Sequence, residues 1–147
     1  MKYPCALFCL LLLCSPHSHA MTMEELATLI ASKASQSHQQ AGSVFFEYQG
    51  VNMIMMSDSQ ADRMRIMAPV DDLDGHSTDH LLTLMEANFH SALDARYALR
   101  GTRIYALYLH PLSSLAPAEA SAAMDQVANL AHTYGTSYNS TGLHFQR

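Results

Sequence analysis

The sequence predicts an α+β fold in which helices pack on an antiparallel sheet. Two observations carry this prediction. Runs of β-forming residues come in pairs separated by two-residue turns that contain Gly, and segments with helical periodicity stand at the beginning, middle and end of the chain. The predicted order is α-β-β-β-α-β-β-α. A chain of 147 residues without internal repeats is too short for two ordinary domains, so we expect one.

Composition excludes two broad classes of protein. The chain is 49% hydrophobic and 14% charged, which is too apolar for a disordered protein. Its net charge is −5, and Lys33 is the only lysine after Lys2. Binding to a nucleic-acid backbone requires a basic surface, so we expect no nucleic-acid partner.

Residues 1–20 have the layout of a secretory signal peptide. Lys2 precedes a ten-residue apolar block, Cys5–Cys14, and small residues precede a cleavage site after Ala20. The block is about half of the ~20 residues that span a bilayer, so no stable membrane insertion is expected after cleavage. We therefore predict a periplasmic or secreted protein.

The cysteines agree with export. All three lie inside the predicted signal, so the mature chain has no thiol and no disulfide framework. A lipoprotein signal that ends at Cys14 is the alternative, although Leu13 is large where such signals carry a small residue. The mature protein must be held together by its hydrophobic core.

The first half of the mature chain is predicted to form a helix followed by three strands. Thr22 and Glu25 have the spacing of a capping box and predict a helix over about 23–35. The polar stretch 35–42 is expected to be a loop. Three β-rich runs follow as a meander, and an acidic loop at 71–75 ends it: the runs are 43–48, 51–56 and 63–70.

The second half is predicted to form a helix, a hairpin and a last helix. Ser77 or Thr78 caps the middle helix, whose expected buried stripe is Leu81, Leu84, Met85 and Phe89. Strands 95–100 and 103–110 flank Gly101, and the last helix runs from Pro117 to a stop at Gly135. The domain is thus expected over 21–135, with a loose tail over 136–147. The predicted core consists of Leu26, Leu29, Ile30, Leu84, Phe89, Val127 and Leu130.

Several short stretches, taken in order, resemble a known family. They are Met64–Val70, Leu82–Phe89 and Tyr97-Ala98-Leu99, followed by Pro111-Leu112 and the alanine-rich last helix. Together they resemble the YbjN-like domain of the type III secretion chaperone-like superfamily over residues 23–135. The resemblance implies a small non-enzymatic α+β domain that often dimerises. Chaperone relatives hold an extended partner segment against the sheet and helices, and they work in the cytosol without a signal peptide.

Two groups of polar residues partly match the patterns of metal-binding sites. His76 and His80 have the HxxxH spacing, but Ser77 stands where the zinc-protease motif has Glu. Asp71, Asp72 and Asp74 precede Gly75 as in a calcium loop, yet the pattern puts Val70 and Leu81 at its first and twelfth positions. We expect a solvated loop and helix start here, with no bound metal and no cofactor.

Methionines gather in one predicted hairpin. Thioethers are soft ligands for Cu(I), and Met is also the adaptable residue of cores and binding surfaces. A protein-binding surface is the leading interpretation, and copper binding is the alternative. The predicted partner-binding residues are Phe45, Met53, Met55, Met56, Met64 and Met67.

Enzyme signatures are missing from the sequence. The mature chain has no cysteine nucleophile, no G-x-S-x-G, no P-loop and no Rossmann glycine pattern. We therefore predict a non-enzymatic module that binds an unidentified protein. A second copy of the chain is one candidate for that partner.

Overall fold

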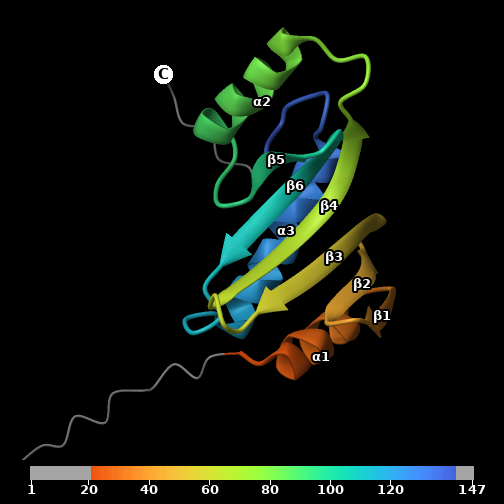
Figure 1. Ribbon diagram of the computed structural model, residues 1–147, viewed down its shortest axis with the longest axis vertical. Helices are drawn as coiled ribbons and strands as arrows, with labels where there is room; N and C mark the ends of the chain where they lie inside the picture. The colour runs from red at the N-terminus through yellow and green to blue at the C-terminus, as the bar shows by residue number, and fades with distance from the viewer. Residues whose placement is uncertain (1–20, 142–147) are drawn as a thin grey trace, which may run out of the picture.

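A computed structural model describes residues 21–141 and shows three helices and one six-stranded antiparallel sheet. The strands lie in the order β1-β2-β3-β4-β6-β5 (Figure 1). The α+β class is confirmed, with one more strand than expected. The elements are α1 (Met23–Lys33), β1 (Gln36–Gln40), β2 (Ser43–Tyr48), β3 (Val51–Asp58), β4 (Arg63–Asp72), α2 (Thr78–His90), β5 (Arg96–Arg100), β6 (Arg103–His110) and α3 (Pro117–His132).

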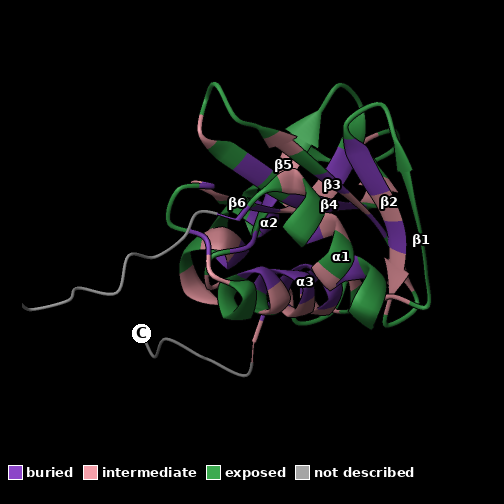
Figure 2. Cartoon of the chain, turned by 90° about the horizontal axis from the view of Figure 1, so that it is seen from below, coloured by how far each residue is buried: buried purple, intermediate pink, exposed green. Residues whose placement is uncertain are grey.

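The helices are distributed unequally around the sheet. Helices α1 and α3 lie together on one face, with α3 against β4 and β6 (Figure 2). Helix α2 stands at one end of the molecule and contacts β5 (Figure 1). Among residues 21–141, no helix lies on the other face, which we call the uncovered face of the sheet.

Local signals set the helix starts. The Thr22–Glu25 capping box is formed: the Thr22 backbone N–H donates to Glu25 Oε2 (2.7 Å), and the Glu25 N–H donates to Thr22 Oγ1 (3.2 Å). Ser77 caps α2 by accepting from the His80 backbone N–H. Pro117 occupies the first turn of α3, where its missing N–H costs nothing.

The predicted two-residue turns are confirmed. Gln49 and Gly50 both have positive φ (52° and 76°), as a type I′ hairpin requires. Gly101, at φ 61°, opens the turn between β5 and β6.

The core lies between the sheet and helices α1 and α3. Leu26, Ile30 and Leu84 are buried as predicted, as are Val127 and Leu130, and Leu29 is half-buried. The prediction for Phe89 is wrong, because its side chain is 79% exposed. Met85 of the same predicted stripe is also exposed. Helix α2 turns only Leu84 and Ala87 fully inward.

The expected loop at 35–42 is a strand. Residues Gln36–Gln40 form β1, which pairs with β2 from Gln36↔Glu47 to Gln40↔Ser43. Ala41 and Gly42 have positive φ and make the connecting turn. Strand β1 carries no apolar residue, so it lacks the alternation that marks a strand in sequence.

The tail was expected to be loose from residue 136, and this is wrong for residues 136–141. Ser140 is fully buried: its Oγ accepts from the Leu93 N–H (2.6 Å), and its carbonyl accepts from Asn129 Nδ2 (3.1 Å). The Tyr138 carbonyl accepts from Ser91 Oγ. Polar contacts therefore fix this segment against the end of α2 and against α3. The predicted signal peptide lies outside the described residues.

Candidate protein-binding surface

Strict alternation along the strands produces two different faces. Met53 and Met55 on β3, and Met64 and Ile66 on β4, point toward the helices and are buried. Their neighbours along each strand point to the uncovered face. This face is the candidate site, because strands do not expose extended apolar surface without a reason.

An apolar row crosses the uncovered face. The register pairs Phe45 with Ile54, Ile54 with Met67, and Met67 with Leu107, which brings four strands together. Beside this row lie Met56 and Leu109, whose side chains are 38% and 51% exposed. These residues, with Tyr105 opposite Pro69, form a contiguous patch, which we call the apolar row and its flank.

The row ends in a hollow at the β1 side. His38 of β1 stacks on Phe45, with ring centroids 5.1 Å apart. Around them is a concavity of about 570 Å³, whose lining includes Gln36, Ile54 and Pro69. The hollow is mostly apolar with a few polar groups, which is the usual character of a recognition pocket.

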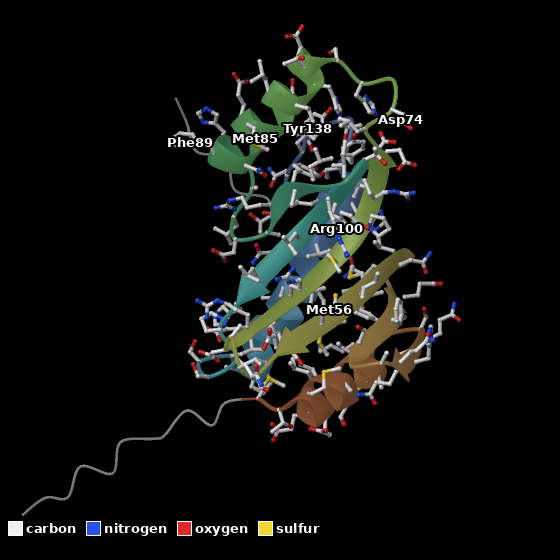
Figure 3. The ribbon with its side chains drawn as sticks, viewed as in Figure 1. Met56, Asp74, Met85, Phe89, Arg100 and Tyr138 are labelled. Atoms are coloured by element: carbon white, nitrogen blue, oxygen red, sulfur yellow. The ribbon has the colours of Figure 1, made fainter. Side chains whose placement is uncertain are left out.

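Arginines surround the apolar row. Arg63 and Arg65 on β4, Arg96 and Arg100 on β5, and Arg103 on β6 all have the parity of the uncovered face. They are five of the eight Lys and Arg residues of a chain with a net charge of −5. Figure 3 shows Arg100 and Met56 on this face. The face is thus locally positive on an acidic protein.

Few of these arginines are neutralised. Arg103 Nε donates to Asp72 Oδ1 at 2.7 Å, and both side chains are about half exposed. Arg63 and Arg96 donate to backbone carbonyls. The side chains of Arg65 and Arg100 have no hydrogen bond or ion pair with any of the residues 21–141. Free guanidinium groups beside apolar side chains suit a ligand that carries carboxylates.

The structure divides the predicted partner-binding residues into two sets. Phe45, Met56 and Met67 have the parity of the uncovered face, where Met56 is exposed, Phe45 is half-buried and Met67 is 7% exposed. Met53, Met55 and Met64 are at most 1% exposed and belong to the core, so a partner cannot reach them in the folded protein. The binding-surface prediction is kept only for the first set. The arginines were missed, although their alternation with buried residues (Arg63, Met64, Arg65, Ile66) carries the signal.

The same division bears on the copper alternative. Met53 and Met55 do share one face of β3, as predicted, but that face packs against helices rather than solvent. Met56 and Met67 point the opposite way, so the five hairpin methionines do not converge. This dispersal is typical of methionine as a core filler.

A second polar cluster lies at the start of α2. His76 Nε2 is 2.9 Å from Asp71 Oδ2, and His80 Nε2 is 2.7 Å from the Tyr134 hydroxyl. The two imidazoles stack, with centroids 4.1 Å apart. The Asp72 backbone N–H and the His76 side chain hold the pKa of Asp71 below its usual value, while burial and the nearby Asp71 raise the pKa of Tyr134.

This cluster joins the end of β4, the start of α2 and the residues just after α3. Within residues 21–141, no group of three or more His, Cys, Asp or Glu side chains is arranged to hold a metal ion. The ring contacts continue from Tyr134 to Tyr97 and Tyr138, so the cluster packs as part of the structure. Both imidazoles thus have partners within the protein.

Two comparisons with known proteins gave no match. No protein-family model matches the chain, and no curated protein matches it. In the part of the chain that the structure describes, no helix is both long and apolar enough to cross a membrane. The uncovered face is therefore the feature from which a function can be inferred.

Proposed function

We propose that this protein is an exported, non-enzymatic module that holds a segment of a partner protein on the uncovered face of its sheet. The observation that carries the proposal is the contiguous apolar row with unpaired arginines beside it. A face that only needed to be soluble would carry polar residues in place of Phe45, Ile54, Met56 and Leu109. The family resemblance also implies binding of a partner segment, although an extended one.

The face favours a helical partner over an extended one. A sheet presents side chains on its face, whereas its backbone N–H and C=O groups point to neighbouring strands. An extended segment laid on the face would bury backbone groups without hydrogen-bond partners, but a helix satisfies its own. From β2 to β6 the row crosses three strand spacings, roughly 14 Å, which about ten residues of helix would span.

The arginines define the charge of this partner. Carboxylates beside the apolar stripe of the helix would meet the guanidinium groups of Arg65 and Arg100, which have no partner within the described residues. We therefore expect an amphipathic helix with acidic flanks.

A peptide titration tests this proposal. The probe is a helix-stabilised 16-residue peptide with leucines on one face and glutamates beside them, and the control peptide has lysines in place of the glutamates. We expect saturable binding of the acidic peptide, weaker at high salt because exposed charges are screened. Arg65→Glu should lower its affinity roughly tenfold, the size expected when a charged contact is reversed. Equal binding of both peptides, or no binding of either, would contradict the proposal.

Export has its own test. Intact-mass analysis of the protein from its native cell envelope or medium should give a chain that begins at Met21. A full-length mass from the cytosol would contradict this part of the proposal.

A further inference from the structure

Helix α2 carries an apolar stripe that is mostly exposed in the described part of the protein. Leu82, Met85 and Phe89 are 56%, 53% and 79% exposed. Their spacing of three and four residues places them on one side of the helix. Figure 3 shows Met85 and Phe89 on α2, at the end of the molecule away from α1. These are three of the six large hydrophobic residues that the described chain exposes.

The opposite side of α2 is firmly attached. Leu84 and Ala87 are buried, and Asn88 binds the edge of β5: its Nδ2 donates to the Tyr97 carbonyl (3.1 Å), and its Oδ1 accepts from the Tyr97 N–H (2.7 Å). The helix therefore cannot rotate to bury its stripe without losing these contacts. Within residues 21–141 the stripe therefore stays exposed, and only something outside these residues can cover it.

The stripe has acidic flanks. Asp79 lies three residues before Leu82 and Glu86 four residues after it, so both carboxylates border the stripe and both are exposed. Lys and Arg are absent from α2. Helix α2 therefore has the features proposed for the partner of the uncovered face: apolar residues on one side of a helix, with carboxylates beside them.

We infer that α2 of one copy docks on the uncovered face of a second copy. The stripe of α2 covers about 10 Å from Leu82 to Phe89, which fits within the roughly 14 Å from Phe45 to Leu107. Glu86 and Asp79 would meet arginines of the face. The contact joins two apolar surfaces of the described chain, which include five of its six exposed large hydrophobic residues, and pairs its negative helix with its positive face.

This self-association rests on the same face as the proposed function and gives it a control. A partner helix and α2 of a second copy would compete for one surface. In the absence of partner, the apolar row is covered by another copy and is protected from non-specific contacts. Partner binding would release the copies from each other.

Complementation between two defective variants tests the inference. The helix variant is Met85→Glu with Phe89→Glu, and the face variant is Arg65→Glu with Leu109→Glu; all four positions are exposed, so both should fold. Leu99→Glu is the matched control, because Leu99 is 49% exposed but lies on neither surface. Circular dichroism melts check folding, and sedimentation velocity over a concentration series measures association.

The expected pattern is specific to a contact between α2 and the face. The parent and Leu99→Glu should associate as concentration rises, whereas each defective variant alone should associate roughly tenfold more weakly or less. An equimolar mixture of the two variants should associate again, since one supplies an intact helix and the other an intact face. A monomeric parent, a helix variant that associates like the parent, or a mixture that stays monomeric would each overturn the inference.

The same variants separate this inference from the proposed function. The helix variant keeps its face, so it should bind the acidic peptide at least as tightly as the parent. If it binds peptide but the parent does not self-associate, only the inference fails. If the parent self-associates through α2 but binds no peptide, the proposed function fails and the inference stands.

Discussion

The covered and uncovered faces of the sheet are built from the same strands, and both contain methionines and other apolar residues. One face forms the core, and the other is in contact with solvent. On the covered face, Met53, Met55 and Met64 are packed against helices whose alanines allow close approach. On the uncovered face, Met56 and Leu109 stay in contact with solvent, and arginines stand between them. Hydrophobic content therefore does not decide which face is core. Helix coverage does, and the charges mark the face that is left for binding.

The sharpest test of this comparison is one charge on each face. Met55→Glu places a carboxylate at a fully buried position without a partner, so we expect a loss of more than about 4 kcal/mol of stability and an unfolded domain. Phe45→Glu lies on the uncovered face and should cost only about 1 kcal/mol, while it removes peptide binding. Urea unfolding and the peptide titration measure the two effects.

One result would contradict the assignment of the covered and uncovered faces. If Met55→Glu folds and both variants bind peptide like the parent, the assignment of the two faces is wrong.

Helix α2 repeats the comparison on a smaller scale. Leu84 is buried and Phe89 is exposed on the same helix, so Leu84→Ala should cost about 2–5 kcal/mol and Phe89→Ala less than about 0.5 kcal/mol. Leu130→Ala on α3 should resemble Leu84→Ala. Chemical denaturation curves give all three values. A loss below about 1 kcal/mol at both leucines would mean that the helical faces are misassigned.

The attachment of α2 to β5 has a smaller, local effect. Asn88→Ala leaves the Tyr97 N–H and C=O without their side-chain partner, which should cost about 1–3 kcal/mol. Asn52→Ala, at an exposed position of β3, is the matched control and should be nearly neutral. Hydrogen exchange should show lost protection at the Tyr97 amide in the Asn88 variant. Unchanged protection there would argue against the attachment described above.

Sequence reasoning succeeded where a local physical signal exists. Each of these signals is a residue type that the local structure needs. Thr22 and Ser77 cap helices through their side chains, and Gly50 and Gly101 adopt the positive φ of their turns. These signals, with alternation in β2 to β6, were sufficient for the α+β class and for most element positions.

Sequence reasoning failed where tertiary contacts decide. Strand β1 is polar throughout and exists because its backbone pairs with β2. The stripe of α2 was predicted to be core because periodicity shows that a helix has an apolar side, but not which side the protein covers. The uncovered face could be recognised only in part, since the parity of Phe45 and Met55 was visible while the number of covering helices was not.

The smallest expected effect concerns the turn between β3 and β4, where Asp62 holds the loop after β6. Asp62 Oδ1 accepts from the Ser113 N–H (2.7 Å) and Oδ2 from the Ser113 hydroxyl (2.6 Å), and these bonds lower the pKa of Asp62. A carboxyl with a lowered pKa in the folded state contributes stability above its unfolded pKa of about 3.9, and this stability is lost as the pH falls through the folded value.

Asp62→Asn should therefore lower the stability of the protein at pH 6 and have a smaller effect at pH 3. Asn also tolerates the positive φ of 51° at this position, so the backbone is not strained. Urea midpoints at the two pH values measure the effect, and Ser113→Ala should reproduce it. A stability difference that grows toward pH 3 would show that the Ser113 contacts do not favour the ionised carboxyl.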